Sequence, residues 1–237
     1  MMDIPSDPDL KFVILTGAGI SRESGLATFR DADGIWAKHR IEDVATPEAF
    51  TRDPQRVLDF YNARRSQMAG IKPNAAHYAL TKLQYARPGN VTIVTQNIDG
   101  LHEAAGATDV INMHGVLART RCNACATISE FAGSLDARMS CDACGAIGTL
   151  RPDVVWFGEM PYKMDLIESR LSAVDVFVSI GTSGNVYPAA GFVAAANAVG
   201  AHTIELNLEP SSGSGLFDEC YQGPASETVP AFVDRLT

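Results

Sequence analysis

The 237-residue sequence predicts an α/β protein in which a doubly wound parallel sheet carries a small inserted lobe of helices plus a zinc ribbon. Three observations lead to this prediction. Short runs of β-branched and other apolar residues alternate with helix-like segments, polar residues follow the end of each run, and two cysteine pairs interrupt the alternation. Strands separated by helices favour a parallel sheet covered on both faces.

The expected strands are, in chain order, "KFVILTGAG", "NVTIVTQNID", "DVINMHG", "DVFVSIGTS" and "HTIELNLE". Helix-like segments lie between them at residues 76–86, 163–173 and 187–199. Residues 35–73 and 119–149 break the alternation and could fold together. We therefore expect a large domain formed by residues 1–34, 74–118 and 150–237, and a small domain formed by residues 35–73 and 119–149.

Four of the five cysteines form two C-x2-C pairs, Cys122 with Cys125 and Cys141 with Cys144. This spacing is typical of a zinc ribbon, and two disulfides are the alternative. Four thiolates fill a tetrahedron, so the predicted zinc is structural and not catalytic. Cys220 has no partner in the pattern and is expected to be a buried thiol.

Polar residues follow all five predicted strands. In open α/β sheets, ligands bind beyond the carboxyl ends of the strands, so these residues should line one crevice. They are Gly17 to Gly19, Gln96, Asn97, Asp99, His114, Gly181 to Ser183, and Asn207.

Single motifs leave alternatives open. "TGAGISRESG" is similar to a dinucleotide-binding loop, but Arg22 stands where the G-x-G-x-x-G pattern needs glycine, so a simple tight turn fits equally well. His114 could be a structural histidine, although its place at a strand end favours a general base. "VVWFGE" could form a core strand or line an apolar tunnel.

Composition narrows the function. A formal charge of −9 argues against nucleic-acid binding, which needs clustered basic residues. The first residues lack the features of a secretory signal, and "AAGFVAAANAVGA" is too short to span a bilayer. We expect a cytoplasmic monomer that contacts neither nucleic acid nor membrane.

The motifs taken together resemble the sirtuin family of NAD-dependent protein deacylases. The segments that carry the resemblance span residues 16 to 209: "GAGIS", "ATFR", "TQNIDGLH", "HG", both cysteine pairs, "VVWFGE", "GTS" and "NLE". Ala27 departs from the proline that is usual in the family before "TFR". The resemblance implies a Rossmann-like NAD-binding domain, NAD+ as co-substrate and one structural Zn2+.

The resemblance also implies roles for individual residues. Phe29 would shield the reactive sugar carbon, and His114 would be the general base. The implied cofactor-binding residues are Gly17, Ala18, Gly19, Ser21, Phe29, Arg30, Gln96, Asn97, Ile98, Asp99, Gly181, Thr182, Ser183 and Asn207. Val155, Trp156 and Phe157 would form a tunnel for the acyl-lysine of a protein substrate, and the backbone around Gly158 and Glu159 would pair with the peptide.

The segment "LDFYNARR" resembles the part of the family that removes acidic acyl groups. There a small residue, Ala45 here, makes room, and Tyr61 and Arg64 would contact the distal carboxylate of succinyl- or malonyl-lysine. Residues three apart share a helix face, which suits this role. Without the resemblance, a solvated helix face would be the simpler interpretation, and Arg65 has no assigned role.

Three other functions were weighed against deacylation. Protein ADP-ribosylation could use the same NAD site, but a base such as His114 favours deacylation. A zinc-ribbon binding module would predict a degraded pocket or a basic surface. The glycine loop that does not match, and the absence of an acidic residue directly ending a second adjacent strand, argue against a hydride-transferring dehydrogenase.

Overall fold

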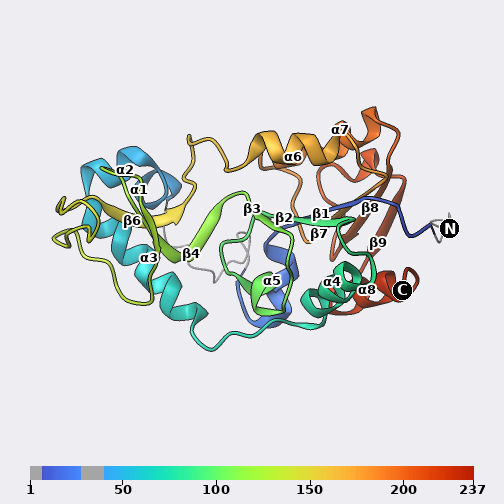
Figure 1. The fold of residues 1–237 in the computed structure, drawn as a ribbon, viewed down its shortest axis with the longest axis horizontal. Coiled ribbons are helices and arrows are strands. Elements are labelled where there is room, and N and C mark those ends of the chain that lie inside the picture. Colours follow the sequence, from blue (N-terminus) through green and yellow to red (C-terminus); the bar gives the residue numbers. More distant parts are fainter. Residues whose placement is uncertain (1–6, 28–39) are drawn as a thin grey trace.

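The computed structural model describes residues 7–27 and 40–237, and its centre is a six-stranded sheet in the order β3-β2-β1-β7-β8-β9 (Figure 1). All neighbouring strands in it are parallel. The strands are β1 (Phe12–Thr16), β2 (Val91–Thr95), β3 (Val110–Asn112), β7 (Val176–Ile180), β8 (His202–Asn207) and β9 (Glu219–Gln222). The predicted fold class and the five expected strands are confirmed.

Helices cover both faces of this sheet, which makes it doubly wound (Figure 1). On one face lie α4 (Ala75–Ala86) and α8 (Ala225–Val233), which pack Leu80 and Phe232 against the sheet. On the other face lie α6 (Met164–Leu171) and α7 (Phe192–Ala198), which contribute Leu171 and Phe192. Strands β1, β2 and β7 are buried along their whole length because both faces are covered.

A second, antiparallel sheet has the order β5-β4-β6, formed by β4 (Gly115–Cys122), β5 (Ile128–Glu130) and β6 (Leu150–Val154). It packs with α1 (Ile41–Val44), α2 (Pro47–Arg52) and α3 (Pro54–Met68) at the end of the molecule opposite the C-terminus (Figure 1). The two segments that interrupt the alternation therefore do meet. The predicted boundary between residues 118 and 119 falls inside β4, and the division into two domains stays a prediction.

Local sequence explains where the helices of this lobe begin. Asp53 caps α3 by accepting a hydrogen bond from the Arg56 N–H at 3.1 Å, and Pro54 occupies the first helical position. Thr46 and Pro47 begin α2 in the same way. Short elements complete the described chain: η1 (Ala18–Ser24), α5 (Leu101–Ala104), η3 (Ala189–Gly191) and η4 (Ser214–Leu216).

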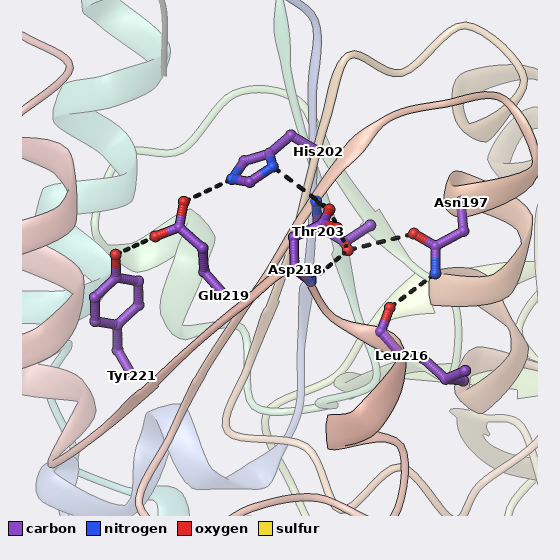
Figure 2. A network of polar contacts seen from close by, with 7 residues as sticks. All are labelled: Asn197, His202, Thr203, Leu216, Asp218, Glu219 and Tyr221. Carbon is purple, nitrogen blue, oxygen red and sulfur yellow. Dashed lines mark hydrogen bonds and ion pairs between the residues drawn. The ribbon is translucent and has the colours of Figure 1, made fainter. Parts of the chain in front are cut away.

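Edge strand β9 was not predicted, and polar contacts help to hold it (Figure 2). Asp218 accepts hydrogen bonds from the Thr203 N–H and hydroxyl at 2.8 and 2.9 Å. His202 bridges two carboxylates, with Nε2 2.8 Å from Glu219 and Nδ1 3.4 Å from Asp218. The described helices include none that is long and apolar enough to cross a membrane.

Candidate active site

Two glycine loops meet at the carboxyl ends of β1 and β7. The Gly17 N–H donates to the Ile180 carbonyl at 3.0 Å, and the Gly19 N–H donates to the Gly181 carbonyl at 2.8 Å. A Cβ on Gly19 would lie 2.7 Å from the Gly181 Cα, and one on Gly181 would lie 2.4 Å from the Ile20 nitrogen. Because side chains here would clash with backbone, the glycines let the two strand ends pack directly against each other.

A chain of hydrogen bonds joins three predicted site residues beside these loops. The Asn97 amide donates to the Gly17 carbonyl at 3.0 Å and to the Ser21 hydroxyl at 3.3 Å. The Ser21 hydroxyl in turn donates to Asp99 at 2.7 Å, and the Leu101 N–H donates to the same carboxylate. Burial raises the pKa of Asp99, and these two donors oppose the rise. The side chains of Ser21, Asn97 and Asp99 are thus fixed in one network.

Sequence reasoning missed a layer of buried polar side chains beneath this network. The Thr16 hydroxyl lies 2.9 Å from both the Thr95 hydroxyl, to which it donates, and Nε2 of His102. Thr95 also accepts from the Asn97 N–H at 3.1 Å. Burial lowers the pKa of His102 to about 3, so this histidine is neutral and supports Asn97 without titrating near pH 7.

His114 lies between β3 and β4 and faces Gln96. Its Nδ1 is 3.0 Å from the Gln96 carbonyl oxygen, which can only accept, so Nδ1 carries the proton and Nε2 holds a lone pair. Burial lowers the pKa of His114, although the bond to Gln96 opposes the change. A neutral imidazole with an available Nε2 can accept a proton near pH 7.

Gln96 also presents a donor suited to a ligand. Its Nε2 is buried, and it has no acceptor within residues 7–27 and 40–237. At the neighbouring strand ends, the Asn207 amide donates to the Thr182 carbonyl at 2.7 Å, and the Ser212 N–H donates to the Ser183 carbonyl at 3.1 Å. Together with the close-packed glycine loops, these polar groups fit a dinucleotide laid along the edge of the sheet.

Four of the predicted cofactor residues lie outside these networks or outside the described residues. Ala18 begins η1 directly after the first glycine. Ile98 packs against the core of the small lobe, and its carbonyl accepts from the Leu117 N–H at 2.9 Å. Phe29 and Arg30 lie outside the described residues.

One of the predicted acyl-binding residues contacts His114, and three others share a buried cluster. The Val155 N–H donates to the His114 carbonyl at 2.9 Å, and the Phe157 N–H donates to the Ala45 carbonyl at 3.0 Å. Ala45, Tyr61 and Trp156 belong to one buried apolar cluster. Small-lobe helices and the segment after β6 therefore meet beside the candidate base, while Gly158, with a φ of +91°, turns the chain that follows.

Tyr61 is not on a solvated helix face, because only 4% of it is exposed. Burial raises the pKa of its hydroxyl, and the charge of Arg64 opposes the rise. Burial also lowers the pKa of Arg64, and the negative charges of ionised Tyr61 and Asp99 oppose this change. Tyr61 and Arg64 therefore interact electrostatically in a region from which solvent is largely excluded.

Arg65, the neighbouring arginine, has a different task. Its Nε donates to the Leu117 carbonyl at 3.2 Å, and its Nη1 donates to Asn62 and to the Gly133 carbonyl, both at 3.1 Å. It therefore ties α3 to β4 and to the loop after β5. The two adjacent arginines have separate roles.

The side chain of Glu159 has partners within the chain. It forms a bidentate ion pair with Arg151, with both N–O distances 2.7 Å, and it accepts from the Trp156 N–H at 2.8 Å. Sequence reasoning missed Arg151, although a lone arginine before the apolar run "PDVVWF" is a signal for a buried, paired charge.

The four paired cysteines lie within 4.8 Å of one another, sulfur to sulfur. The closest pairs, Cys122 with Cys144 and Cys125 with Cys141, are both 3.8 Å apart, which excludes disulfides. Four thiolates about 2.3 Å from a tetrahedral zinc ion would be about 3.8 Å apart, so the cluster fits zinc. The prediction that Cys220 is buried is wrong: it is exposed on edge strand β9.

Comparison with known proteins agrees with this geometry. A model described as "Sir2 family" matches residues 17–188. An "NAD-dependent protein deacylase" of Caulobacter vibrioides is 56% identical over 230 residues, covering 96% of this chain and 97% of that protein. A protein of the same description from Escherichia coli K12 is 56% identical over 228 residues, covering 95% and 82%.

Solved structures give the same result. A Sir2 homologue in complex with NAD superimposes with a TM-score of 0.87 at 36% identity, covering 97% of this chain and 90% of that one. A Sir2 protein with a deacetylated p53 peptide and 3'-O-acetyl ADP ribose gives a TM-score of 0.81 at 28% identity, covering 95% of this chain and 92% of that one. With a family model matched over most of its length and relatives more than half identical to it, the chain belongs to the Sir2 family.

Proposed function

We propose that this protein is an NAD-dependent lysine deacylase that removes acetyl and acidic acyl groups, such as succinyl and malonyl, from protein substrates. The observation that carries the proposal is the tautomer of His114. Its Nδ1 proton is held by the Gln96 carbonyl, and its Nε2 remains able to accept a proton beside a site that fits a dinucleotide. The names of the full-length relatives, NAD-dependent protein deacylases, support it.

NAD+ would supply an electrophilic sugar carbon to which the acyl oxygen becomes bonded as nicotinamide leaves. Gln96, through its buried Nε2, would hold the ribose, and the network of Ser21, Asn97 and Asp99 would hold the carboxamide side. His114 would remove a proton from the ribose hydroxyls. The deprotonated hydroxyl would then attack the acyl carbon, and one water would be taken up as the lysine amine leaves. The expected products are free lysine, nicotinamide and O-acyl-ADP-ribose.

Acidic acyl groups are supported by the pairing of Tyr61 with Arg64. Moving an unpaired carboxylate into an apolar site costs several kcal/mol. A hydrogen bond to a charged group returns about 1.5–3 kcal/mol, and a tyrosine donor adds about 1 kcal/mol. Tyr61 and Arg64 could therefore offset much of this cost, and the small side chain of Ala45 would leave room for the longer acyl group.

The products test the proposal. The purified protein is incubated with an acyl-lysine peptide, with and without NAD+, and the products are identified by mass spectrometry. O-acyl-ADP-ribose formed in equal amount to free lysine is the expected result, and it should vanish in His114→Ala. ADP-ribose attached to protein, without loss of the acyl group, would show instead that the chain is an ADP-ribosyltransferase.

We propose zinc for the four-cysteine cluster, with a structural role only. The cluster holds Cys122, Cys125, Cys141 and Cys144 close to tetrahedral spacing, and four thiolates leave no coordination position for a reacting water. One zinc ion per chain, measured by elemental analysis of the purified protein, is the expected result.

A further inference from the structure

Trp156 is fixed on several sides within the small lobe. Only 2% of it is exposed. The Arg151 guanidinium lies 3.5 Å from the centre of its ring, and the Phe50 ring centre is 5.3 Å away. The Trp156 backbone N–H donates to Glu159, which also pairs with Arg151. The indole therefore has little freedom to rotate.

The indole N–H of Trp156 is a buried donor that forms no hydrogen bond of good geometry with the described residues. Nε1 is inaccessible to solvent, and no acceptor meets it in hydrogen-bonding geometry within residues 7–27 and 40–237. Buried tryptophan N–H groups usually have a partner, because an unsatisfied donor destabilises the fold. A rigid ring with such an N–H can donate to a ligand without moving.

Trp156 lies in the same buried cluster as Tyr61, one of the two proposed contacts of the acyl carboxylate. Burial raises the pKa of the Tyr61 hydroxyl, and both the charge of Arg64 and a weak hydrogen-bond contribution from the Trp156 indole oppose the rise, in keeping with the shared cluster. Two acidic side chains whose charges act on Tyr61 or Arg64 already have partners. Glu159 is paired with Arg151, and Asp99 accepts from Ser21 and Leu101.

We propose that Trp156 is a specificity residue whose indole N–H donates a hydrogen bond to the distal carboxylate of an acidic acyl-lysine, beside Tyr61 and Arg64. This inference rests on the proposed function and deepens it. A carboxylate offers about four lone-pair positions, enough for three donors. Acetyl-lysine carries no acceptor at that distance from the lysine, so the N–H discriminates between the two substrates.

The first test is Trp156→Phe, which keeps an aromatic ring for Arg151 and Phe50 to pack against but removes the N–H. We measure kcat/KM for one peptide carrying succinyl-lysine or acetyl-lysine. The succinyl-to-acetyl ratio should fall about tenfold, the effect of one hydrogen bond to a charged group. An unchanged ratio overturns the proposal.

Phe50→Leu is the matched control. It loosens the packing on the indole ring without removing a donor, so it should affect both substrates alike and leave the ratio unchanged. A fall in the ratio as large as that in Trp156→Phe would show that ring packing, and not the N–H, sets the specificity.

A second measurement, by NMR, does not depend on the enzymatic activity of any variant. The chain contains two tryptophans, so an indole-15N-labelled sample gives two indole N–H signals in NMR. The signal that is lost in Trp156→Phe and retained in Trp36→Phe belongs to Trp156. Without NAD+, a succinyl-lysine peptide should move this proton signal downfield more than acetyl-lysine or the neutral succinamide analogue. Equal movement by the succinyl and succinamide peptides overturns the proposal.

Arg64→Met shows whether a negative result concerns only the role of Trp156 or the proposed carboxylate site as a whole. If it abolishes succinyl removal while Trp156→Phe leaves the ratio unchanged, only the role of Trp156 fails. If Arg64→Met leaves succinyl removal intact, the proposed carboxylate site itself fails, and the role of Trp156 with it.

Discussion

At the scale of single residues, His114 shows how a backbone carbonyl can fix the tautomer of a proposed general base. The Gln96 carbonyl accepts the Nδ1 proton, and this bond alone decides which nitrogen can act as a base. Sequence reasoning placed His114 at a strand end. It could not assign the tautomer, because that depends on an atom 18 positions away in the chain.

The pH dependence of kcat/KM tests the role of His114. Burial lowers its pKa, so the neutral form persists to lower pH than for an exposed histidine. Activity should therefore be constant near pH 7 and fall as pH drops through a midpoint below 6.5. His114→Ala should reduce kcat/KM by roughly 10²–10⁴-fold. A midpoint above 7 would contradict this assignment.

Arg64 and Arg65 are adjacent in the chain but have different roles. Arg64 lies beside Tyr61, whereas Arg65 bonds the carbonyls of Leu117 and Gly133. The three-residue spacing of Tyr61 and Arg64 was enough to predict that they share a face. The role of Arg65 depends on β4 and on the loop after β5, so the local sequence could not reveal it.

At the scale of elements, continuous apolar runs predicted the central strands because both of their faces are buried. β9 was missed because "ECYQ" is short, half-exposed and at the edge of the sheet. β4 and β6 were not recognised as partners, since antiparallel pairing across the cysteine segment leaves no local signature. The pairing of Arg151 with Glu159 was likewise set by the turn at Gly158.

We expect the stability of the folded protein to depend on pH through the contacts that attach β9. The Thr203 N–H and hydroxyl hold the pKa of Asp218 below its usual range, despite some opposition from burial. A carboxylate with a lowered pKa stabilises the fold above its unfolded pKa, near 4, and loses that contribution as pH falls through the folded value. Acidification below about pH 4 should therefore weaken the attachment.

Asp218→Asn is the variant that measures this contribution. The side chain is 42% exposed, so solvent screening limits the expected loss in unfolding free energy to about 1 kcal/mol at pH 7. The difference from wild type in urea unfolding should shrink at pH 3, where the wild-type carboxylate begins to protonate. A difference that is the same at both pH values would argue against a charge effect.

At the scale of the whole molecule, the site lies where the parallel sheet meets the small lobe. The sheet contributes Gln96, Asn97 and Asp99, and the lobe contributes Ala45, Tyr61 and Trp156. The antiparallel sheet that carries Cys122 also carries Val154, next to the proposed acyl-binding segment. Metal binding should therefore stabilise the lobe on which the acyl site depends.

Removal of the metal tests this dependence. Cys141→Ser, or treatment with a strong chelator, should lower the thermal midpoint by roughly 10 °C or more, because zinc-binding free energies are large and each kcal/mol shifts the midpoint by about 2–4 °C. Cys220→Ser is the control and should change nothing, since Cys220 lies outside the cluster. Equal midpoints for Cys141→Ser and wild type would exclude a structural metal.

The central claim is an NAD-dependent deacylase with a carboxylate site at Tyr61 and Arg64. The most direct measurement is kcat/KM for one peptide bearing acetyl-lysine or succinyl-lysine, with and without NAD+, in wild type, Arg64→Met and Arg65→Met. Arg64→Met should lose succinyl removal about 100-fold while acetyl removal persists, and Arg65→Met should lower stability without changing the ratio. If wild type removes only acetyl groups and Arg64→Met matches it, the carboxylate site does not exist. Loss of both acyl groups at equal rates without NAD+ would contradict the whole account.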